Sequence, residues 1–491
     1  METRMKSLFL LLVTGLVAFA QVETLPAPVV HGNSFEILSN SRYSFHSGFT
    51  STLPTQVLAN VLWAMSRVPR LGAYREIYVA TPSNVYLYDD SSHTITVHLS
   101  GNHRYSANSA FEVGVACERY EEAGYAIQAG LLAGVAFWDS AGGTVTTCPM
   151  QFATNYANSN WNPNHTIRMV NVYGQGSARG LVRTVQAVSS DSSLPLPDVV
   201  GTDSFEVLLA TLHQDTVFDP ANLPLEKISQ LLWAAYGVTP HTASGGNRGT
   251  TIPSAVARYY LTRKIYLVRD VGVDLYHNRL PPGTNLTTSD HRLQLVTSGD
   301  RRPQLRAACP RIPSTAPVYI IVTVRDTSLN YSMLEAGFAG FQLLMQANAL
   351  GLQGSLTAPL LPAERSAVIQ ALGIPDTNLP VIVFSTGEPV VGVDEGMGEG
   401  RPALAVARVK GGVRLTYRLV EPAVVGFVIY DLAGRPVRTW PQQPQPAGRH
   451  VLEWNGSDDR GARLPDGVYL CRLTASGAKS HQLSARITLI H

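Results

Sequence analysis

The chain has 491 residues, of which 45% are hydrophobic and 15% charged, so it is a globular protein large enough for two or three domains. Its formal net charge of +2 provides no electrostatic attraction for nucleic acid or for an anionic membrane surface. We therefore expect no nucleic-acid partner.

The N-terminal segment has the pattern of an export signal. Arg4 and Lys6 precede an apolar run at 8–20, which ends in Ala-Phe-Ala before Gln21. Signal peptidase requires such a small-x-small ending, so residues 1–20 are predicted to be a signal peptide. The mature protein is then secreted, periplasmic or at the bacterial cell surface. A membrane anchor is the alternative, but the run is shorter than the roughly 20 residues of a spanning helix.

Two segments 170 positions apart have nearly the same sequence, LANVLWAMSRV at 58–68 and ISQLLWAAYGV at 228–238. Further along the chain, REIY matches RKIY at an offset of 188, and EEAGYA matches LEAGFA at an offset of 213. Chance similarities would not stay in order while the offset grows. The pattern indicates a duplicated domain whose first copy has lost loops.

The two copies are predicted to span 33–185 and 203–392, and their mixture of helical and β-branched segments indicates an α+β fold. The apolar stretch at 123–137 predicts a buried helix in the first copy. In the second copy the helix at 333–350 is apolar on nearly every face and contains small residues, so it must be covered on all sides. We expect the copies to pack through these helices as a homodimer would, giving a monomer that is an internal pseudo-dimer.

The second copy resembles a known family. Its successive motifs are LPLEKISQLLWAAYGV, RGTTIPSAVARYYLTRKIYLV, GVDLYH, EAGFAGFQLLMQANALGLQG and a strand ending in VFSTG. In this order they are similar to the nitroreductase-like flavoproteins, most of all the SagB-type dehydrogenase branch. The resemblance implies a dimer-like arrangement that holds FMN between two copies and passes hydride through it.

The same resemblance implies which first-copy residues bind the cofactor. Family members use an Arg-x-Ser-x-Arg segment and later basic residues for the flavin phosphate and ribityl chain. The segment SRYSFH matches with Arg42 and Ser44, and His46 replaces the second basic residue. Arg179 and Arg183 follow the last predicted strand of the first copy. Arginine binds phosphate through its fork of N–H donors, although Arg42 and Arg179 are equally consistent with ordinary surface charges.

The second copy contributes the loop that the resemblance places against the flavin ring, Pro253, Ser254 and Ala255. The first copy lacks this loop, and the second lacks the N-terminal arginine motif. One composite FMN site per chain is therefore expected, with the other site lost. A simple turn before a strand is the alternative interpretation of the loop. Ala257 replaces a polar residue that is common in relatives, which weakens the prediction of FMN.

After a glycine-rich acidic linker at 393–402, residues 403–491 show strand and turn patterns and no helical period, which indicates a small β-sandwich. The segments FVIYDLAGRPVRTW and AGRHVLEWNGSDDRGARLPDGVYLCRL resemble FlgD-like Ig-fold domains of exported bacterial proteins. That resemblance implies attachment to the cell surface or to secretion machinery.

Export would permit disulfides, and the four cysteines allow three complete pairings. Their spacing does not select one. Cys117 with Cys148 is the favoured pair because both lie in the first copy, and Cys471 is interpreted as a buried free thiol on a strand.

Two functions remain open. In the first, the protein is an exported FMN-dependent oxidoreductase acting on an unidentified small molecule or peptide, with no predicted catalytic side chain because the cofactor performs the redox step. In the second, the duplicated fold has lost its flavin and is an exported binding or structural module. No spacing of cysteine, histidine or carboxylate residues predicts a metal site.

Overall fold

The structure is a computed structural model, and the segments it describes are 21–45, 49–50, 52–138, 144–176, 179–188, 193–242, 248–279, 289–389, 403–409, 412–431, 435–477 and 480–489. The predicted signal peptide, His46 and the predicted linker lie outside these segments. Within them, no helix has the length and apolarity needed to cross a bilayer.

The first copy is built on a seven-stranded antiparallel sheet in the order β1-β4-β3-β2-β5-β7-β6. The central strand FEVGVAC is buried along its whole length because helices and loops cover both faces of the sheet. In chain order the strands are β1 (Val22–Thr24), β2 (Arg75–Ala80), β3 (Asn84–Asp89), β4 (Thr94–Ser100), β5 (Phe111–Cys117), β6 (Thr144–Pro149) and β7 (Ile167–Gly176).

The second copy repeats this sheet without the edge strand β1. Its order, β12-β11-β10-β13-β15-β14, corresponds strand by strand to β4-β3-β2-β5-β7-β6. The same connectivity in both halves confirms the predicted duplicated α+β fold. The strands are β10 (Ile265–Arg269), β11 (Gly272–Arg279), β12 (Ser289–Ser298), β13 (Val318–Val324), β14 (Gln353–Thr357) and β15 (Leu379–Gly387).

The helices also correspond in pairs, α1 with α5, α2 with α6, α3 with α8, and α4 with α9. In the first copy they are α1 (Phe35–Ser41), α2 (Thr55–Ser66), α3 (Tyr120–Val135) and α4 (Gln151–Asn160). In the second copy they are α5 (Phe205–Ala210), α6 (Leu225–Tyr236), α8 (Asn330–Ala349) and α9 (Pro362–Leu372), with α7 (Arg302–Ala308) as an addition.

The copies differ most between the second helix and the next strand. The first copy passes from α2 to β2 through residues 67–74 alone. The second copy inserts the two-stranded ribbon of β8 (Val238–Thr242) and β9 (Arg248–Thr250) and the short 3-10 helix η2 (Ala255–Ala257) between α6 and β10. The Pro-Ser-Ala loop lies in this insertion.

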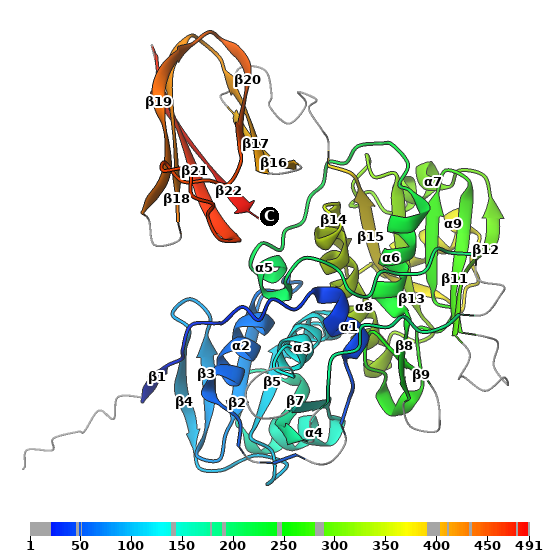
Figure 1. The fold of residues 1–491 in the computed structure, drawn as a ribbon. Coiled ribbons are helices and arrows are strands. Elements are labelled where there is room, and N and C mark those ends of the chain that lie inside the picture. Colours follow the sequence, from blue (N-terminus) through cyan, green and yellow to red (C-terminus); the bar gives the residue numbers. More distant parts are fainter. Residues whose placement is uncertain are drawn as a thin grey trace, which may run out of the picture.

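The copies pack together through α3 and α8, as the sequence predicted (Figure 1). Every residue from Glu121 to Val135 of α3 is buried, because α2 and the first sheet cover the sides that α8 does not. One continuous hydrophobic cluster includes Leu131 from the first copy and Leu344 from the second. Burial of apolar surface is the main driving force for this association.

Residues 403–489 form a β-sandwich with its own hydrophobic core, which confirms the predicted all-β tail. Strand burial alternates as the sequence suggests, so Tyr469, Cys471 and Leu473 all face the core. The two sheets contain β16 (Ala403–Val409), β17 (Gly412–Leu419) and β20 (Gly448–Trp454), and β18 (Ala423–Tyr430), β19 (Pro436–Gln445), β21 (Gly467–Ser476) and β22 (Ser480–Leu489). The domain boundaries proposed from the sequence stay predictions.

The favoured disulfide between Cys117 and Cys148 is wrong, because all four cysteines are free thiols. Strand β7 lies between the strands that carry these two residues. Across the sheet, Cys148 is aligned with Val172 of β7, and Val172 is aligned with Glu112 of β5. Cys117 is therefore two strands away from Cys148 and five residues farther along β5 than the aligned position. Disulfide-bonded Cα atoms lie within about 7 Å of each other, and this register keeps the two cysteines beyond that distance.

Candidate functional site

Arg42, which follows the last residue of α1, extends its side chain into the second copy. Its Nε atom donates to the carbonyl oxygen of Thr251 at 3.1 Å, and its Nη2 atom donates to that of Thr250 at 2.8 Å. Nη1 donates to the hydroxyl of Ser44 at 3.1 Å. Only 3% of Arg42 is exposed, and this burial lowers the pKa of the guanidinium to about 10, so it remains charged at neutral pH. Arg42 therefore connects the copies just before the Pro-Ser-Ala loop.

The Pro-Ser-Ala loop itself is held by α8. The Ser254 hydroxyl donates to Oε1 of Glu335 and accepts a hydrogen bond from the backbone N–H of Tyr259 at 2.7 Å. Ala257 and Tyr259 have φ values of 51° and 52°, in the left-handed region that non-glycine residues rarely occupy. Tertiary contacts, rather than local preference, hold the backbone in this shape.

A cavity of about 670 Å³ lies between the copies at this loop. Ligand sites in proteins commonly have volumes of about 300–1,000 Å³ and mostly apolar walls. The first copy lines it with residues that include Ser44, Phe49, Tyr105, Cys148, Met150 and Phe152. The second copy lines it with Pro253, Ser254, Ala255, Tyr331, Leu334, Glu335 and Phe338.

The structure thus brings together the two halves that the sequence separated by more than 200 residues, Ser44 on one wall and Pro253 to Ala255 on the other. Sequence reasoning missed the wall formed by residues 148–152. These residues lie at the end of β6 and the start of α4, and their sequence CPMQF belongs to none of the motifs that indicate the repeat or the family resemblance. It also missed Glu335, although the repeated Glu-Ala-Gly motif contains it.

The basic residues predicted to bind phosphate do not line this cavity. Arg42 lies behind Ser44, and Arg179 places its guanidinium 4.4 Å from the centre of the Tyr43 ring, a cation–π contact. Arg183 is exposed. Among the described lining residues there is no lysine or arginine. The cavity walls therefore fit a flat, largely apolar ring better than a phosphate group.

Glu335 is the only carboxyl group among the described lining residues. It is 1% exposed, and burial is the main cause that raises its pKa to about 8. Hydrogen bonds from Ser254 and Tyr236 and from the backbone near Tyr260 and Leu261 oppose this rise. Near neutral pH the carboxyl group is largely protonated and able to give up or take back a proton.

Residues 217–388 match the Nitroreductase family. They form a nitroreductase-family domain. Residues 405–479 match the FlgD Ig-like domain, as the sequence of the tail suggested. No curated protein matches the chain significantly. The nitroreductase-family domain contains the Pro-Ser-Ala loop and Glu335, and the family match supports an oxidoreductase class for it.

Several solved structures are similar to parts of this chain. A proposed nitroreductase from Anabaena variabilis is 13% identical, with 71% of this chain and 93% of that chain covered and a TM-score of 0.48. An FMN-dependent nitroreductase from Clostridium difficile is 12% identical, with coverage of 38% and 89% and a TM-score of 0.26. FlgD from Pseudomonas aeruginosa is 24% identical, with coverage of 17% and 65% and a TM-score of 0.15. These overall likenesses are weak, so the assignment of the nitroreductase-family domain rests on residues 217–388.

Proposed function

We propose that the protein is an exported, flavin-dependent oxidoreductase of the nitroreductase-like, SagB-type class, with one cofactor site in the cavity between its two copies. The observation that carries this proposal is the shared cavity, which has Ser44 on one wall and Pro253, Ser254 and Ala255 on the other. When bound, a flavin supplies a ring that accepts hydride and passes it on.

The residues of this chain would bind and orient that ring. Small side chains at Ser254 and Ala255 allow close approach to the backbone, and Phe338 and Met150 supply apolar contact. Because the Ser44 hydroxyl accepts a hydrogen bond from Arg42, its own proton remains available for an acceptor in the cavity. Arg42, Arg179 and Arg183 are proposed here to support the site from outside the cavity.

One observation favours the second function, a flavin-free binding module. The guanidinium of Arg42 donates its hydrogen bonds to Thr250, Thr251 and Ser44. The same N–H groups would be needed to bind a phosphate group. A cofactor whose phosphate is not held by a cation would bind mainly through its ring.

The two functions are separated by incubating the purified protein with FMN or with riboflavin, which lacks the phosphate, and measuring flavin absorbance after gel filtration. We expect about one flavin per chain with either compound. Ala255→Trp fills the cavity and should abolish retention, whereas Ala187→Trp at an exposed position should not. A protein that retains neither flavin would overturn the oxidoreductase proposal and support the module. Retention of FMN alone would contradict recognition through the ring.

We also propose export through residues 1–20 and attachment to the bacterial surface or secretion machinery through the FlgD Ig-like domain. The support is the signal-like N-terminus and the domain match at 405–479. Protein isolated from cell fractions should begin at Gln21 and be found outside the cytoplasm. An intact Met1 in a purely cytoplasmic protein would contradict this proposal.

A further inference from the structure

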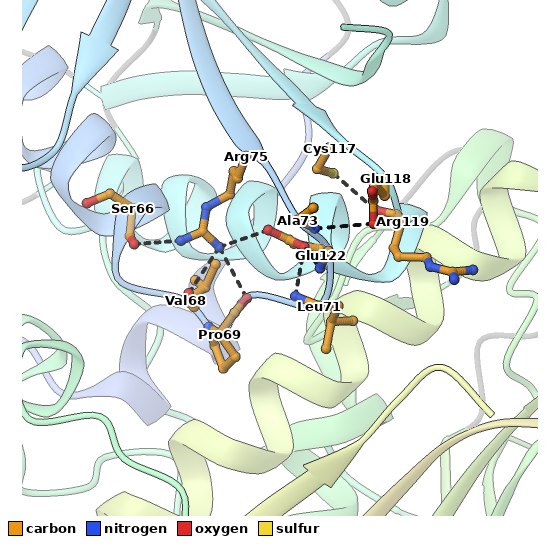
Figure 2. Close-up of polar contacts among 11 residues, drawn as sticks. Ser66, Val68, Pro69, Leu71, Ala73, Arg75, Cys117, Glu118, Arg119 and Glu122 are labelled. Atoms are coloured by element: carbon orange, nitrogen blue, oxygen red, sulfur yellow. Dashed lines mark hydrogen bonds and ion pairs between the residues drawn. The ribbon is translucent and has the colours of Figure 1, made fainter.

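Glu335 and Glu122 are equivalent residues of the two copies, 213 positions apart, yet their surroundings differ. In the first copy, Oε1 of Glu122 forms an ion pair with Nη1 of Arg75 at 3.4 Å, and both side chains are almost fully buried. Oε2 accepts hydrogen bonds from the backbone N–H groups of Leu71 and Gly72 at 2.8 and 3.0 Å (Figure 2).

Arg75 is itself fully engaged around this carboxylate. It donates to the carbonyl oxygens of Ser66, Val68 and Pro69 at 2.8, 3.0 and 3.1 Å (Figure 2). The short connection from α2 to β2 wraps around the pair and supplies most of these partners. Glu122 is thus a paired carboxylate with a structural role, since removing its partner would leave an uncompensated buried charge.

Glu335 has no such cation. Within the described part of the chain it has no ion-pair partner, and Arg263, the residue that matches Arg75, is not bonded to it. Its Oε1 accepts from the Ser254 hydroxyl, and its Oε2 accepts from the Tyr236 hydroxyl at 3.4 Å. The longer insertion of the second copy replaces the wrapping loop of the first and opens the carboxyl group toward the cavity.

The groups that face Glu335 do not supply a positive charge. From α6 comes the phenol of Tyr236, and from the segment after η2 comes the phenol of Tyr260. Across the cavity lies the thiol of Cys148, whose pKa burial raises to about 12. Arg258 is exposed, and its charge opposes the rise that burial causes in the pKa of Tyr260. No cation among these facing groups is bonded to Glu335, and burial raises the pKa of its carboxyl group to about 8.

We propose that Glu335 and Ser254 form a proton-exchange site that serves the molecule bound between the copies. When Glu335 is protonated, the hydrogen bond that its carboxylate accepts from Ser254 is reversed: the Glu335 O–H donates to Oγ of Ser254, and the Ser254 hydroxyl turns to donate to an acceptor atom of the ligand. As negative charge develops on that acceptor atom, the Glu335 O–H bond breaks, its proton passes to Oγ of Ser254, and the hydroxyl proton of Ser254 moves to the acceptor. The carboxylate left behind is stabilised by the Tyr236 hydroxyl and the nearby backbone N–H groups, and reprotonation from solvent restores the site.

This inference rests on the proposed function, because it assumes that a ligand binds in the cavity between the copies. It deepens that function by specifying the ligand class, a neutral aromatic or heteroaromatic ring that carries a carbonyl oxygen or a ring nitrogen as proton acceptor. Ser254 is the group that touches the ligand, and Glu335 acts through it as a positioning and proton-supplying residue.

Two measurements test the inference, each on the full chain with Glu335→Gln and with Glu122→Gln as the matched control. The first is the infrared absorption of protonated carboxyl groups as the pH rises from 6 to 10. We expect a component of this band that disappears near pH 8 in the wild type and in Glu122→Gln but is absent from Glu335→Gln. A component lost near pH 7 belongs to Glu36, whose pKa burial raises to about 7, and should remain in Glu335→Gln. A wild-type protein whose band at pH 6 lacks the component lost near pH 8 overturns the inference.

The second measurement is riboflavin affinity over the same pH range, followed by quenching of flavin fluorescence. The wild type and Glu122→Gln should lose about tenfold in affinity per pH unit above pH 8, because the protonated carboxyl group is the binding form. Glu335→Gln should bind with no pH dependence in this range, and an unchanged wild-type profile in this variant overturns the inference.

The two arms also distinguish failure of the inference from failure of the proposed function. If neither the wild type nor the variants bind flavin at any pH, the proposed function is overturned. The infrared measurement then decides by itself whether Glu335 exchanges a proton at the cavity. Ser254→Ala should keep the infrared band and weaken binding, since it removes the relay but not the carboxyl group.

Discussion

Gly124 of α3 and Gly337 of α8 are equivalent residues of the two copies, and they lie against each other where the helices cross. A Cβ atom at Gly124 would lie 2.6 Å from the carbonyl oxygen of Leu334 and 2.9 Å from Cα of Gly337. A Cβ atom at Gly337 would collide with the backbone of Glu121. The obstacles are backbone atoms, so the helices must move apart to admit a side chain.

Gly124→Ala and Gly337→Ala are therefore expected to destabilise the protein by about 1–3 kcal/mol through overpacking. The measurement is urea unfolding followed by tryptophan fluorescence. Gly134→Ala is the control in the same helix, because its Cβ atom would meet only ordinary contacts at 3.5 Å or more. That variant should be unchanged or up to about 1 kcal/mol more stable. Equal effects of Gly124→Ala and Gly134→Ala would contradict the close helix crossing.

Removing the buried guanidinium of Arg42 should weaken the junction between the copies. Arg42→Ala takes donors away from the buried carbonyl groups of Thr250 and Thr251, and we expect a loss of about 2–4 kcal/mol in the free energy of unfolding. Arg42→Lys should rescue little of it, because one ammonium cannot reproduce the planar fork. Arg460→Ala, at an exposed position of the β-sandwich, should change stability by less than about 0.5 kcal/mol. Full rescue by lysine would show that charge alone matters.

Glu36 should make stability depend on pH. It is 4% exposed, and burial raises its pKa to about 7, although a hydrogen bond from Gln346 at 2.7 Å opposes the rise. Between pH 4.5 and 7 the folded protein then binds more protons than the unfolded chain, so this group's contribution to the free energy of unfolding falls as the pH increases.

Glu36→Gln should consequently gain stability relative to the wild type by about 1.4 kcal/mol per pH unit across that window. Thermal unfolding at a series of pH values measures the difference. Glu364→Gln serves as the control, because Arg311 lowers the pKa of Glu364 to about 2 and the carboxylate stays charged throughout this range. A constant difference between Glu36→Gln and the wild type from pH 4.5 to 7 would refute the assignment.

The four cysteines should behave as buried free thiols. Burial raises the pKa values of Cys117, Cys148 and Cys471 to about 12 and also raises that of Cys309. The thiolate is the reactive form, so a thiol reagent such as Ellman's reagent should react very slowly with the native protein. Unfolding without reductant should expose four reactive thiols per chain. A count of two would mean that a disulfide forms in the protein as isolated.

Much of the fold was predictable because it depends on the local periodicity of apolar residues and on the internal repeat. The apolar stretch at 123–137 predicted helix α3. The strand and turn patterns of residues 403–491 predicted β-strands there, and β17 is one of them, with residues that alternate between buried and partly buried. Collinear motifs predicted the duplication. The prediction that Ser44 and Ser254 share a pocket depended on the resemblance to a family, and both residues line the cavity.

The partners of individual polar groups were not predictable in this way. Arg42 was expected to bind phosphate, but in the structure it donates to the carbonyl groups of Thr250, the last residue of the inserted ribbon, and of Thr251, which follows it. The favoured disulfide failed because strand register, which depends on pairing between distant segments, keeps Cys117 away from Cys148.

The sequence by itself determined the two copies, their order, the helices that join them and the separate β-domain, because each depends on residue periodicity and on repetition along the chain. Only the tertiary structure decided that Glu122 meets an arginine while Glu335 faces a cavity. The two carboxyl groups occupy the same place in the repeat, and loops of different length, folded back from elsewhere in the chain, gave them different neighbours.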